Sequence, residues 1–427
     1  MKKVYFLGIV CLLTSGSLLA QAPIDARSAG MGFSNAAAAQ GLEHLGQNPA
    51  ALALMQNFNF ELNLLSLNAT VFNNSISKSQ YDKYFTTGDT LSDADLNDIL
   101  NSIPQGGWRA DFGANVNAFA MGTRNFSLSV TGVGSGYVTL PRELYELATQ
   151  GNSKIGQVYS FNDLDGQGWG GVSGNLSISI PFRRDVTSGM NLFAFGFTGK
   201  YMFGLGYYEV LSAKGNFFNE IDNVRARGTL EAKTAQRGAG YGVDFGVLFQ
   251  FNHNLTLSLA AENIASSIKW TGEARHELLS IEVDSLAFNL DGLSFPGLVE
   301  DSNYVKSRTT TDIPSFTTTL PTVVNAGFAY HFSRRMLFTG QYTQALSAKF
   351  GLVTKPRVAL GTEITFLPFL PLRAGVAFGG RFDKQLALGT GLNLKFWYLD
   401  VAAVLHGSLN PNQAKGVTLA ATSRFRF

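Results

Sequence analysis

Alternation of apolar and polar side chains with a period of two constrains the fold of this chain more than any other feature. From Tyr241 to Phe251 the odd positions carry Tyr, Val or Phe, while the even positions carry Gly, Asp or Gln, with Leu248 as the exception. After a turn at Asn252 to Asn254 the pattern resumes, and it recurs at 255–262, 386–396 and 417–427. This period predicts strands with one apolar and one polar face.

The composition of the polar face separates a soluble β-sandwich from a membrane barrel. Here that face is mostly Gly, Ala, Ser, Thr and Asn, and only 15% of all residues are charged, against roughly 25% in soluble domains. Many segments run ten or more residues, longer than the usual length of about 5–6 for soluble strands. Lipid cannot satisfy backbone groups, so such strands must close into a barrel. Aromatic residues near segment ends suggest interfacial girdles: Trp108, Trp169, Tyr207, Tyr208, Trp270, Trp397 and Tyr398.

The first twenty residues have the pattern of a secretory signal peptide. A basic "MKK" precedes the apolar "VYFLGIVCLL" and the small-residue "TSGSLLA", and this apolar run is too short to span a membrane as a helix. The single cysteine, Cys11, lies inside the apolar run, so we expect no disulfide or cysteine-ligated metal in the mature chain. Removing Lys2 and Lys3 takes the net charge from +2 (33 minus 31) to zero (31 minus 31). The sequence has no basic stripe of the kind that would indicate nucleic-acid binding.

These features predict an all-β fold, a transmembrane antiparallel β-barrel of about 14 strands, with 16 as the alternative, because single-chain bacterial barrels have even counts. Three stretches interrupt the alternation, 73–105, 141–151 and 278–321, and we expect them at the outer end of the barrel as helical external loops. The first contains a helix from Asp93 to Asn101, capped by Ser92, and the second is itself a short helix. The terminal "SRFRF", with Phe425 and Phe427 on the apolar face, resembles the signal read by the barrel-assembly machinery.

The stretch "GQNPAALAL" is the one helix-like motif ahead of the strands. Asn48 can cap a helix that starts at Pro49 and continues through Ala50 and Leu52. With the upstream "SAGMG" at Ser28 to Gly32, this "NPAALA" resembles the N-terminus of the long-chain fatty-acid outer-membrane transporter superfamily. That superfamily includes the type IX secretion shuttle barrel. The stretches "AENIASSIKWTG" and "PSFTTTLPTVVNAGFAYHF" resemble its uncharacterised branches.

The resemblance implies that this segment folds inside the barrel as a plug, or hatch. It divides the chain into a signal peptide (1–20), a plug (21–56) and a barrel (57–427). A barrel of about 14 strands leaves lumenal space for a plug, and Gly30 and Gly32 allow backbone bends there. The alternative is a periplasmic helix before the first strand. The expected plug residues are Gly30, Gly32, Asn48, Pro49, Ala50 and Leu52.

Sequence motifs of catalysis and metal binding are not found. The five histidines have no metal-ligand spacing, and neither HExxH nor GxSxG occurs. We therefore expect no enzyme activity, no cofactor and no metal.

Two functions remain open. The first is a transporter for hydrophobic small molecules, with Leu286, Phe288, Leu290, Leu293 and Phe295 as candidate first contacts. Those residues could equally pack on one another. The second is a barrel that binds an exported protein through its external loops and acts in secretion or envelope assembly. In both cases the expected surroundings are outer-membrane lipid, with the barrel-assembly machinery as a partner during biogenesis.

Overall fold

The structure is a computed structural model, and it describes residues 24–55, 58–86, 91–150, 156–183, 189–219, 224–252, 254–286 and 304–427. The predicted signal peptide lies outside these residues. Within them, no helix has both the length and the apolar character needed to cross a membrane.

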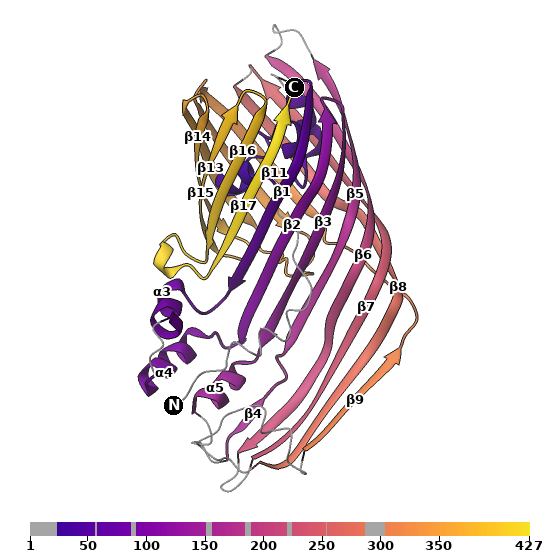
Figure 1. Cartoon of the computed structure of the whole chain (residues 1–427), viewed down its shortest axis with the longest axis vertical. Coiled ribbons are helices and arrows are strands. Elements are labelled where there is room, and N and C mark those ends of the chain that lie inside the picture. Colours follow the sequence, from indigo (N-terminus) through magenta and orange to yellow (C-terminus); the bar gives the residue numbers. More distant parts are fainter. Residues whose placement is uncertain are drawn as a thin grey trace.

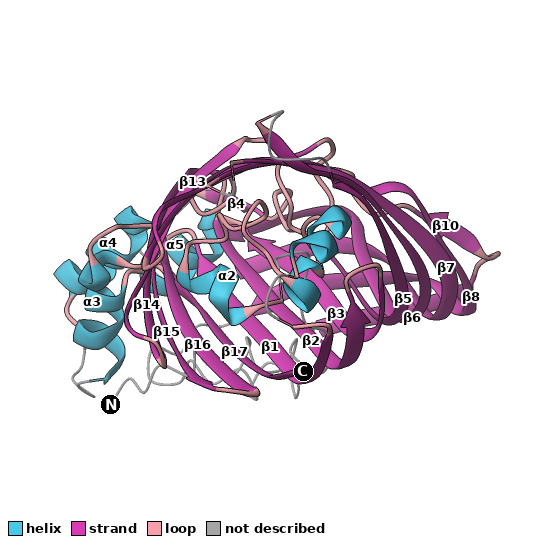
Figure 2. Cartoon of the chain, turned by 90° about the horizontal axis from the view of Figure 1, so that it is seen from above, coloured by secondary structure: helices cyan, strands magenta, loops and turns pink. Residues whose placement is uncertain are grey.

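Fourteen long antiparallel strands form one closed barrel. The first strand, β1, pairs with β2 on one side and with the last strand, β17, on the other, which closes the ring (Figures 1 and 2). The count agrees with the prediction. The barrel strands are β1 Phe60–Asn73, β2 Trp108–Thr123, β3 Phe126–Leu140, β5 Asp165–Arg183, β6 Met190–Asn219, β7 Val224–Phe251, β8 Leu255–Leu286, β11 Val323–Ser333, β12 Met336–Ala345, β13 Arg357–Leu367, β14 Leu370–Gly379, β15 Lys384–Leu394, β16 Trp397–His406 and β17 Gly416–Arg426.

Three further strands pair with long strands near one end of the barrel. β4 (Val158–Ser160) pairs with β6, whereas β9 (Tyr304–Asp312) and β10 (Phe316–Thr318) both pair with β8. Closer to the other end, β8 pairs directly with β11. These three strands therefore extend the wall without adding to the ring.

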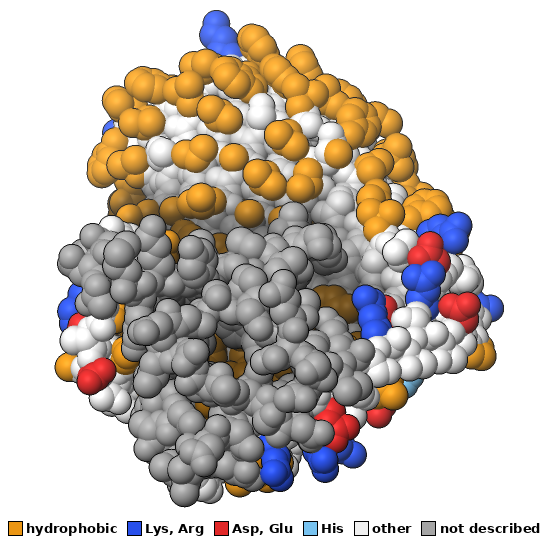
Figure 3. Space-filling view, turned by 60° about the horizontal axis from the view of Figure 1, so that its bottom comes forward, with side chains coloured by type: hydrophobic (Ala, Val, Ile, Leu, Met, Phe, Trp, Pro, Cys, Tyr) orange, Lys and Arg blue, Asp and Glu red, His pale blue; other side chains and the backbone are white. Residues whose placement is uncertain are grey.

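The alternation seen in the sequence sorts side chains between the lumen and the outside. Along β7, odd positions from Tyr241 to Phe251 are exposed or half-buried on the outer face, and the even positions are buried inside. Figure 3 shows apolar side chains spread over the outer surface of the strands, with charged side chains gathered near one end. Such an exterior suits contact with lipid. Leu248, the exception to the pattern, is fully buried and packs on the N-terminal segment.

The barrel wall is unequal in height. Strands β6, β7 and β8 have 30, 28 and 32 residues, whereas β11 to β17 have only 10 or 11 each. Figure 1 shows the long strands reaching well beyond the short ones at the end opposite the C-terminus. We call this the loop end. At the other end, which we call the C-terminal end, the turns at 124–125, 334–335, 368–369 and 395–396 are only two residues long.

The helices outside the barrel lie at the loop end, as predicted for external loops (Figure 1). They are α3 (Lys78–Tyr81), a π-helical turn (Asp82–Thr86), α4 (Asp93–Ser102), α5 (Arg142–Gln150) and the 3-10 turn η7 (Pro411–Gln413). The Ser92 hydroxyl accepts the Asp95 amide N–H and caps α4. Both predicted helices are confirmed.

Two sequence expectations need correction. The stretch 278–321 is not one irregular connection, because β8 continues to Leu286 and the chain returns as β9. Outside the membrane both faces of a strand can be polar, so the alternation that marks a strand fades there. The interfacial girdle is also wrong for Trp169, Tyr207 and Trp270, which are buried in a cluster inside the barrel.

The N-terminal segment lies within the lumen, which confirms the predicted plug and not the alternative of a helix outside the barrel. It contains α2 (Ala26–Gly30) and two 3-10 helices, η1 (Gly41–His44) and η2 (Pro49–Leu54). Figure 2 shows α2 inside the ring of strands. The helix η2 packs on β5, β6 and β7, and α2 packs on β14 to β17.

Candidate functional site

We call the long strands β5 to β8 the tall wall and the short strands β11 to β17 the short wall. The plug contacts the tall wall through η2. Asn48 caps this helix, since its side-chain Oδ1 accepts the Ala50 N–H at 2.9 Å while its Nδ2 donates to the Val247 carbonyl at 3.1 Å. Glycines in the wall make room for this contact. A Cβ on Gly246 would come within 2.0 Å of Asn48 Oδ1, and a Cβ on Gly196 within 2.1 Å of the Ala50 nitrogen.

The opposite side of the plug meets the short strands in the same way. A Cβ on Gly30 would lie 3.0 Å from the Cα of Gly389, and one on Gly375 would lie 2.3 Å from the carbonyl carbon of Met31. Gly32 has a φ of +66°, a backbone conformation that favours glycine. The sequence-predicted plug residues Gly30, Gly32, Asn48, Pro49, Ala50 and Leu52 are all buried in the lumen.

A buried ionic network, which the sequence did not reveal, anchors the plug to the short wall. Arg424 of β17 lies at its centre, with Nη2 2.6 Å from Asp25 and 2.8 Å from Asp400, and Nη1 3.1 Å from Glu43. Asp25 and Glu43 belong to the plug. The network joins five carboxylates to four guanidinium groups: Asp25, Glu43, Glu61, Glu363, Asp400, Arg27, Arg373, Arg424 and Arg426.

Burial and neighbouring charge shift the titration of the plug side chains. Burial raises the pKa of Asp25 to about 6, although Arg424 acts in the opposite direction. Burial would also raise the pKa of Glu43, but Arg27, Arg424 and Arg426 outweigh it and hold that pKa at about 2. Burial lowers the pKa of His44 to about 4, so this imidazole is neutral at pH 7.

A cavity of about 90 Å³ lies in the lumen directly beside the plug. The plug forms one side of it, through Ile24, His44 to Gln47 and Pro49. Apolar side chains from β3, β5, β6 and the segment before β11 form a second side: Val133, Trp169, Met202 and Leu320. Polar side chains complete the lining: Asn115, Thr131, Ser173, Asn175, Thr198, Lys200, Asp244, Glu262 and Asn263.

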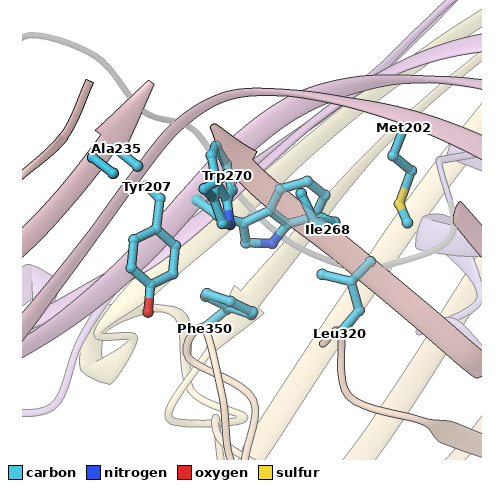
Figure 4. Packing of buried hydrophobic residues seen from close by; sticks show 9 residues of the cluster. Met202, Tyr207, Ala235, Ile268, Trp270, Leu320 and Phe350 are labelled. Carbon is cyan, nitrogen blue, oxygen red and sulfur yellow. The ribbon is translucent and has the colours of Figure 1, made fainter. Parts of the chain in front are cut away.

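The apolar side belongs to an aromatic cluster that covers the cavity toward the loop end. Figure 4 shows Tyr207, Trp270 and Phe350 gathered with Ile268 and Leu320 on the inner face of the long strands. The ring centroids of Tyr207 and Trp270 are 5.5 Å apart. The Trp270 indole N–H donates to Thr318 Oγ1 at 2.9 Å, so its polar atom is satisfied in the apolar surroundings.

A second lumenal cavity, of about 160 Å³, adjoins the first and shares Gly46 and Glu262 with it. Its lining includes Phe33, Phe382 and the guanidinium of Arg357. Arg357 contacts the carbonyl oxygen of Gly32 and the side chain of Gln385. This side of the lumen therefore holds the plug backbone directly.

The wall beside both cavities carries an irregular seam. β8 bulges at 262–264 opposite Asp244 of β7, and Asn263 there has a φ of +52°. On its other side the pairing of β8 stops at Glu262 and resumes at Ile268, and the Ser266 hydroxyl bonds to the backbone of Leu320 in the gap. The two later stretches quoted from the sequence, 261–272 and 314–332, face each other across this seam.

The remaining sequence candidates lie away from the cavities. Leu286 ends β8 at the loop end, and Phe288, Leu290, Leu293 and Phe295 lie outside the described residues. Phe425 pairs with Leu62 of β1. Phe427 is exposed, and its carbonyl accepts the amide N–H of Phe60 at 3.0 Å. Both residues therefore lie where the barrel closes.

The cavity residues Lys200, Asp244 and Glu262 were missed by sequence reasoning. A charged residue on the predicted lumenal face of a strand is the signal that could have identified them. In the sequence pattern Asp244 is one of the polar positions of the alternation. Across the described ranges, no group of three His, Cys, Asp or Glu side chains is placed to hold a metal ion.

Comparison with solved structures finds the same fold in outer-membrane transporters. A Pseudomonas aeruginosa FadL homologue aligns with a TM-score of 0.54 and 13% identity, over 96% of this chain and all of that chain (100%). The Pseudomonas putida toluene transporter TodX gives 0.53 and 11%, covering 96% and 99%. The Ralstonia pickettii toluene transporter TbuX gives 0.52 and 11%, covering 94% and 98%. At these identities the likeness concerns the fold.

Comparison with curated protein sequences gives no match. A family model does match, over residues 49–239 and 218–401. These two ranges overlap and together span most of the barrel and η2 of the plug. The chain therefore belongs to the family described as "Family of unknown function (DUF5723)".

Proposed function

We propose that this protein is a plugged outer-membrane barrel that admits hydrophobic small molecules. The observation that carries the proposal is the lumenal cavity between the plug and an apolar wall of Val133, Trp169, Met202 and Leu320. A water-filled pore needs no such wall. A site that holds an apolar molecule does, because burying apolar surface supplies the binding free energy.

Three other findings support the proposal. The expected signal peptide provides export, and the apolar exterior suits a bilayer. Two of the proteins with a similar fold are toluene transporters, and a third is a FadL homologue. The loops at the loop end, including the segment from Leu286 to Phe295, would supply the first apolar contact for an incoming molecule.

Passage of a molecule through the lumen to the C-terminal end requires that the plug move, because η2 and α2 fill the lumen there. A tether between plug and wall tests this requirement. A Cβ on Gly246 would lie 2.9 Å from the Asn48 side-chain carbon Cγ. The Cβ of residue 48 is one bond further away, so the pair Asn48→Cys and Gly246→Cys places two Cβ atoms near the separation of about 3.5–4.5 Å that a disulfide needs. The mature chain contains no competing cysteine.

The experiment measures uptake of a labelled hydrophobic compound such as toluene by a gene-deletion strain that carries each variant. Wild type should restore uptake, and the double-cysteine variant should restore it only after reduction. Asn48→Cys alone, treated with the same reductant, is the matched control. Uptake that is the same in the deletion strain and in the wild type would overturn the proposal for that compound.

The second candidate is a barrel that binds an exported protein for secretion or envelope assembly. The tall wall favours it, because β6 to β9 project beyond the short strands and β9, within the described part, pairs only with β8. Stable co-purification of an exported protein, lost when residues 274–312 are shortened to a turn, would support this candidate. Co-extraction of a small apolar molecule would support the first.

A further inference from the structure

We propose that the lumenal cavity selects hydrophobic amines, molecules with an apolar body and one cationic nitrogen, and that Glu262 is the residue that binds the nitrogen. This inference rests on the proposed function, because it names the class of molecule that the same cavity would take.

Glu262 is a buried carboxylate at the junction of two cavities. Its side chain lines both of them, and the residue is 8% exposed. The β8 bulge at 262–264 positions it, since the bulge interrupts the alternation and turns two successive residues, Glu262 and Asn263, toward the interior. A bulge beside a cavity is a common way to aim a functional side chain.

Among the described residues, one oxygen of this carboxyl group has a hydrogen-bond donor. Asn325 Nδ2 donates to Glu262 Oε1 at 2.9 Å. The orientation of that amide is set by its other end, where Asn325 Oδ1 accepts from Gln341 Nε2 at 3.1 Å and from Thr343 Oγ1 at 2.8 Å. In the described part of the chain, Glu262 has no cation within 4.0 Å and no second donor. A buried carboxyl group with an unsatisfied oxygen costs free energy unless a ligand supplies the missing donor.

The nearby cation, Lys200, is already engaged. Its Nζ lies 2.8 Å from Asp244 Oδ1 and donates to Asn263 Oδ1 at 3.1 Å. His44, on the plug side of the same cavity, is neutral at pH 7 because burial holds its pKa at about 4. The ionisable lining of the first cavity is therefore one lysine, paired with Asp244, and a second carboxyl group, Glu262, which has no cation beside it among the described residues.

The apolar side of the cavity suits the same class of molecule. Trp169 and Met202 line it, and Phe350 packs on Trp169 with ring centroids 6.1 Å apart. Aromatic rings attract cations as well as apolar groups. A carboxylate combined with an aromatic wall favours an organic amine over a neutral hydrocarbon, and it disfavours a carboxylate ligand at this position.

The test uses three probes with one apolar body and different charge: para-butylbenzylamine, para-butylbenzyl alcohol and para-butylbenzoate. Binding to the purified full chain in lipid nanodiscs is measured at pH 7 by equilibrium dialysis, with empty nanodiscs as the partition blank. We expect the amine to bind about tenfold tighter than the alcohol, the size of effect that a charge-assisted hydrogen bond gives.

Glu262→Gln is the diagnostic variant, because glutamine keeps an acceptor for Asn325 and removes the charge. It should lower the affinity for the amine to that of the alcohol and leave the alcohol unchanged, which also shows that the cavity has folded. Glu282→Gln, on the same strand but exposed at the loop end, is the matched control and should change neither affinity.

The outcomes separate the two proposals. Equal affinities for amine and alcohol in wild type, or an amine affinity unchanged in Glu262→Gln, would overturn the inference about amines alone. Saturable binding of the alcohol in those cases would still support the hydrophobic site. If none of the three probes binds above the blank, the proposed function fails together with the inference.

Discussion

Gly196 lies where the tall wall touches the plug most closely, and replacing it by alanine should undock the plug. The added Cβ would lie 2.1 Å from the Ala50 nitrogen and 2.3 Å from the Pro49 carbonyl carbon. Both atoms are backbone of η2, so no side chain can rotate away. Ordinary contact begins near 3.4 Å, and the plug or the strand must therefore shift by about 1.3 Å (3.4 minus 2.1).

The size of the effect follows from that shift. Overpacking of a closely packed interface costs about 1–3 kcal/mol. Because 1.4 kcal/mol corresponds to a factor of ten, the ratio of undocked to docked plug should rise about 5- to 150-fold. An undocked plug opens a lumen that 14 strands make too wide for side chains alone to fill.

The assay is ion conductance of the purified protein in planar bilayers. Gly196→Ala should raise the mean conductance or the fraction of open time relative to wild type. Gly199→Ala on the same strand is the control, because a Cβ there meets nothing within 4 Å, and it should behave as wild type. If the two variants conduct alike, the close approach of η2 to β6 does not keep the lumen closed, and our account of the plug is refuted.

Three further predictions concern the plug anchor and the seam of the barrel. Arg424→Met leaves Asp25 and three other carboxylates without their central cation, so it should destabilise the fold by about 3–5 kcal/mol, measured as a lower thermal unfolding temperature. Arg308→Met, which removes an exposed partner of Glu277, should leave that temperature nearly unchanged, and equal shifts would contradict the prediction. The pKa of Asp25 is raised from 3.8 to about 6 in the docked plug, so docking should weaken as pH rises from about 4 to 6. The pKa of His44 is lowered from 6.5 to about 4, so docking should weaken as pH falls from 6.5 to about 4. Between pH 4 and 6.5 these two effects oppose each other. On acidification, conductance should therefore rise more steeply in Asp25→Asn than in wild type, and it should fall in His44→Gln. The same conductance profile in both variants would contradict this prediction. Deleting Phe427 should reduce the amount of assembled barrel in membranes, because it removes bonds that close β1 on β17 and the expected assembly signal, and a deletion that assembles as well as Leu419→Ala would count against that role.

The sequence alone predicted the parts of this protein that depend on neighbouring residues. Alternation with a period of two sets which side chains face lipid, so the strands, the closed barrel and the absence of a solvent-exposed polar face could be inferred. The "NPAALA" motif is equally local, because Asn48 caps the helix that follows it directly. Even the one irregular position in the β7 pattern, Leu248, was visible, although its reason was not.

The tertiary structure alone decided which strands rise beyond the membrane and which residues meet in the lumen. Trp169, Tyr207 and Trp270 were assigned to the lipid interface because they end apolar segments, yet bulges and the extra height of β5 to β8 turn them inward. The stretch after Leu278 was assigned to a loop because a strand exposed to water on both faces has no alternation to detect.

The charged groups of the lumen show the same limit most clearly. Asp25 meets Arg424 only because the plug packs inside the closed barrel against β17. Glu262 meets Asn325 only because the Leu255–Glu262 part of β8 pairs with β11, whereas β9 pairs with a later part of β8. A single sequence holds local periodicity and local capping, but the partners of a lumenal side chain depend on strand register across the ring, and register is a property of the closed barrel.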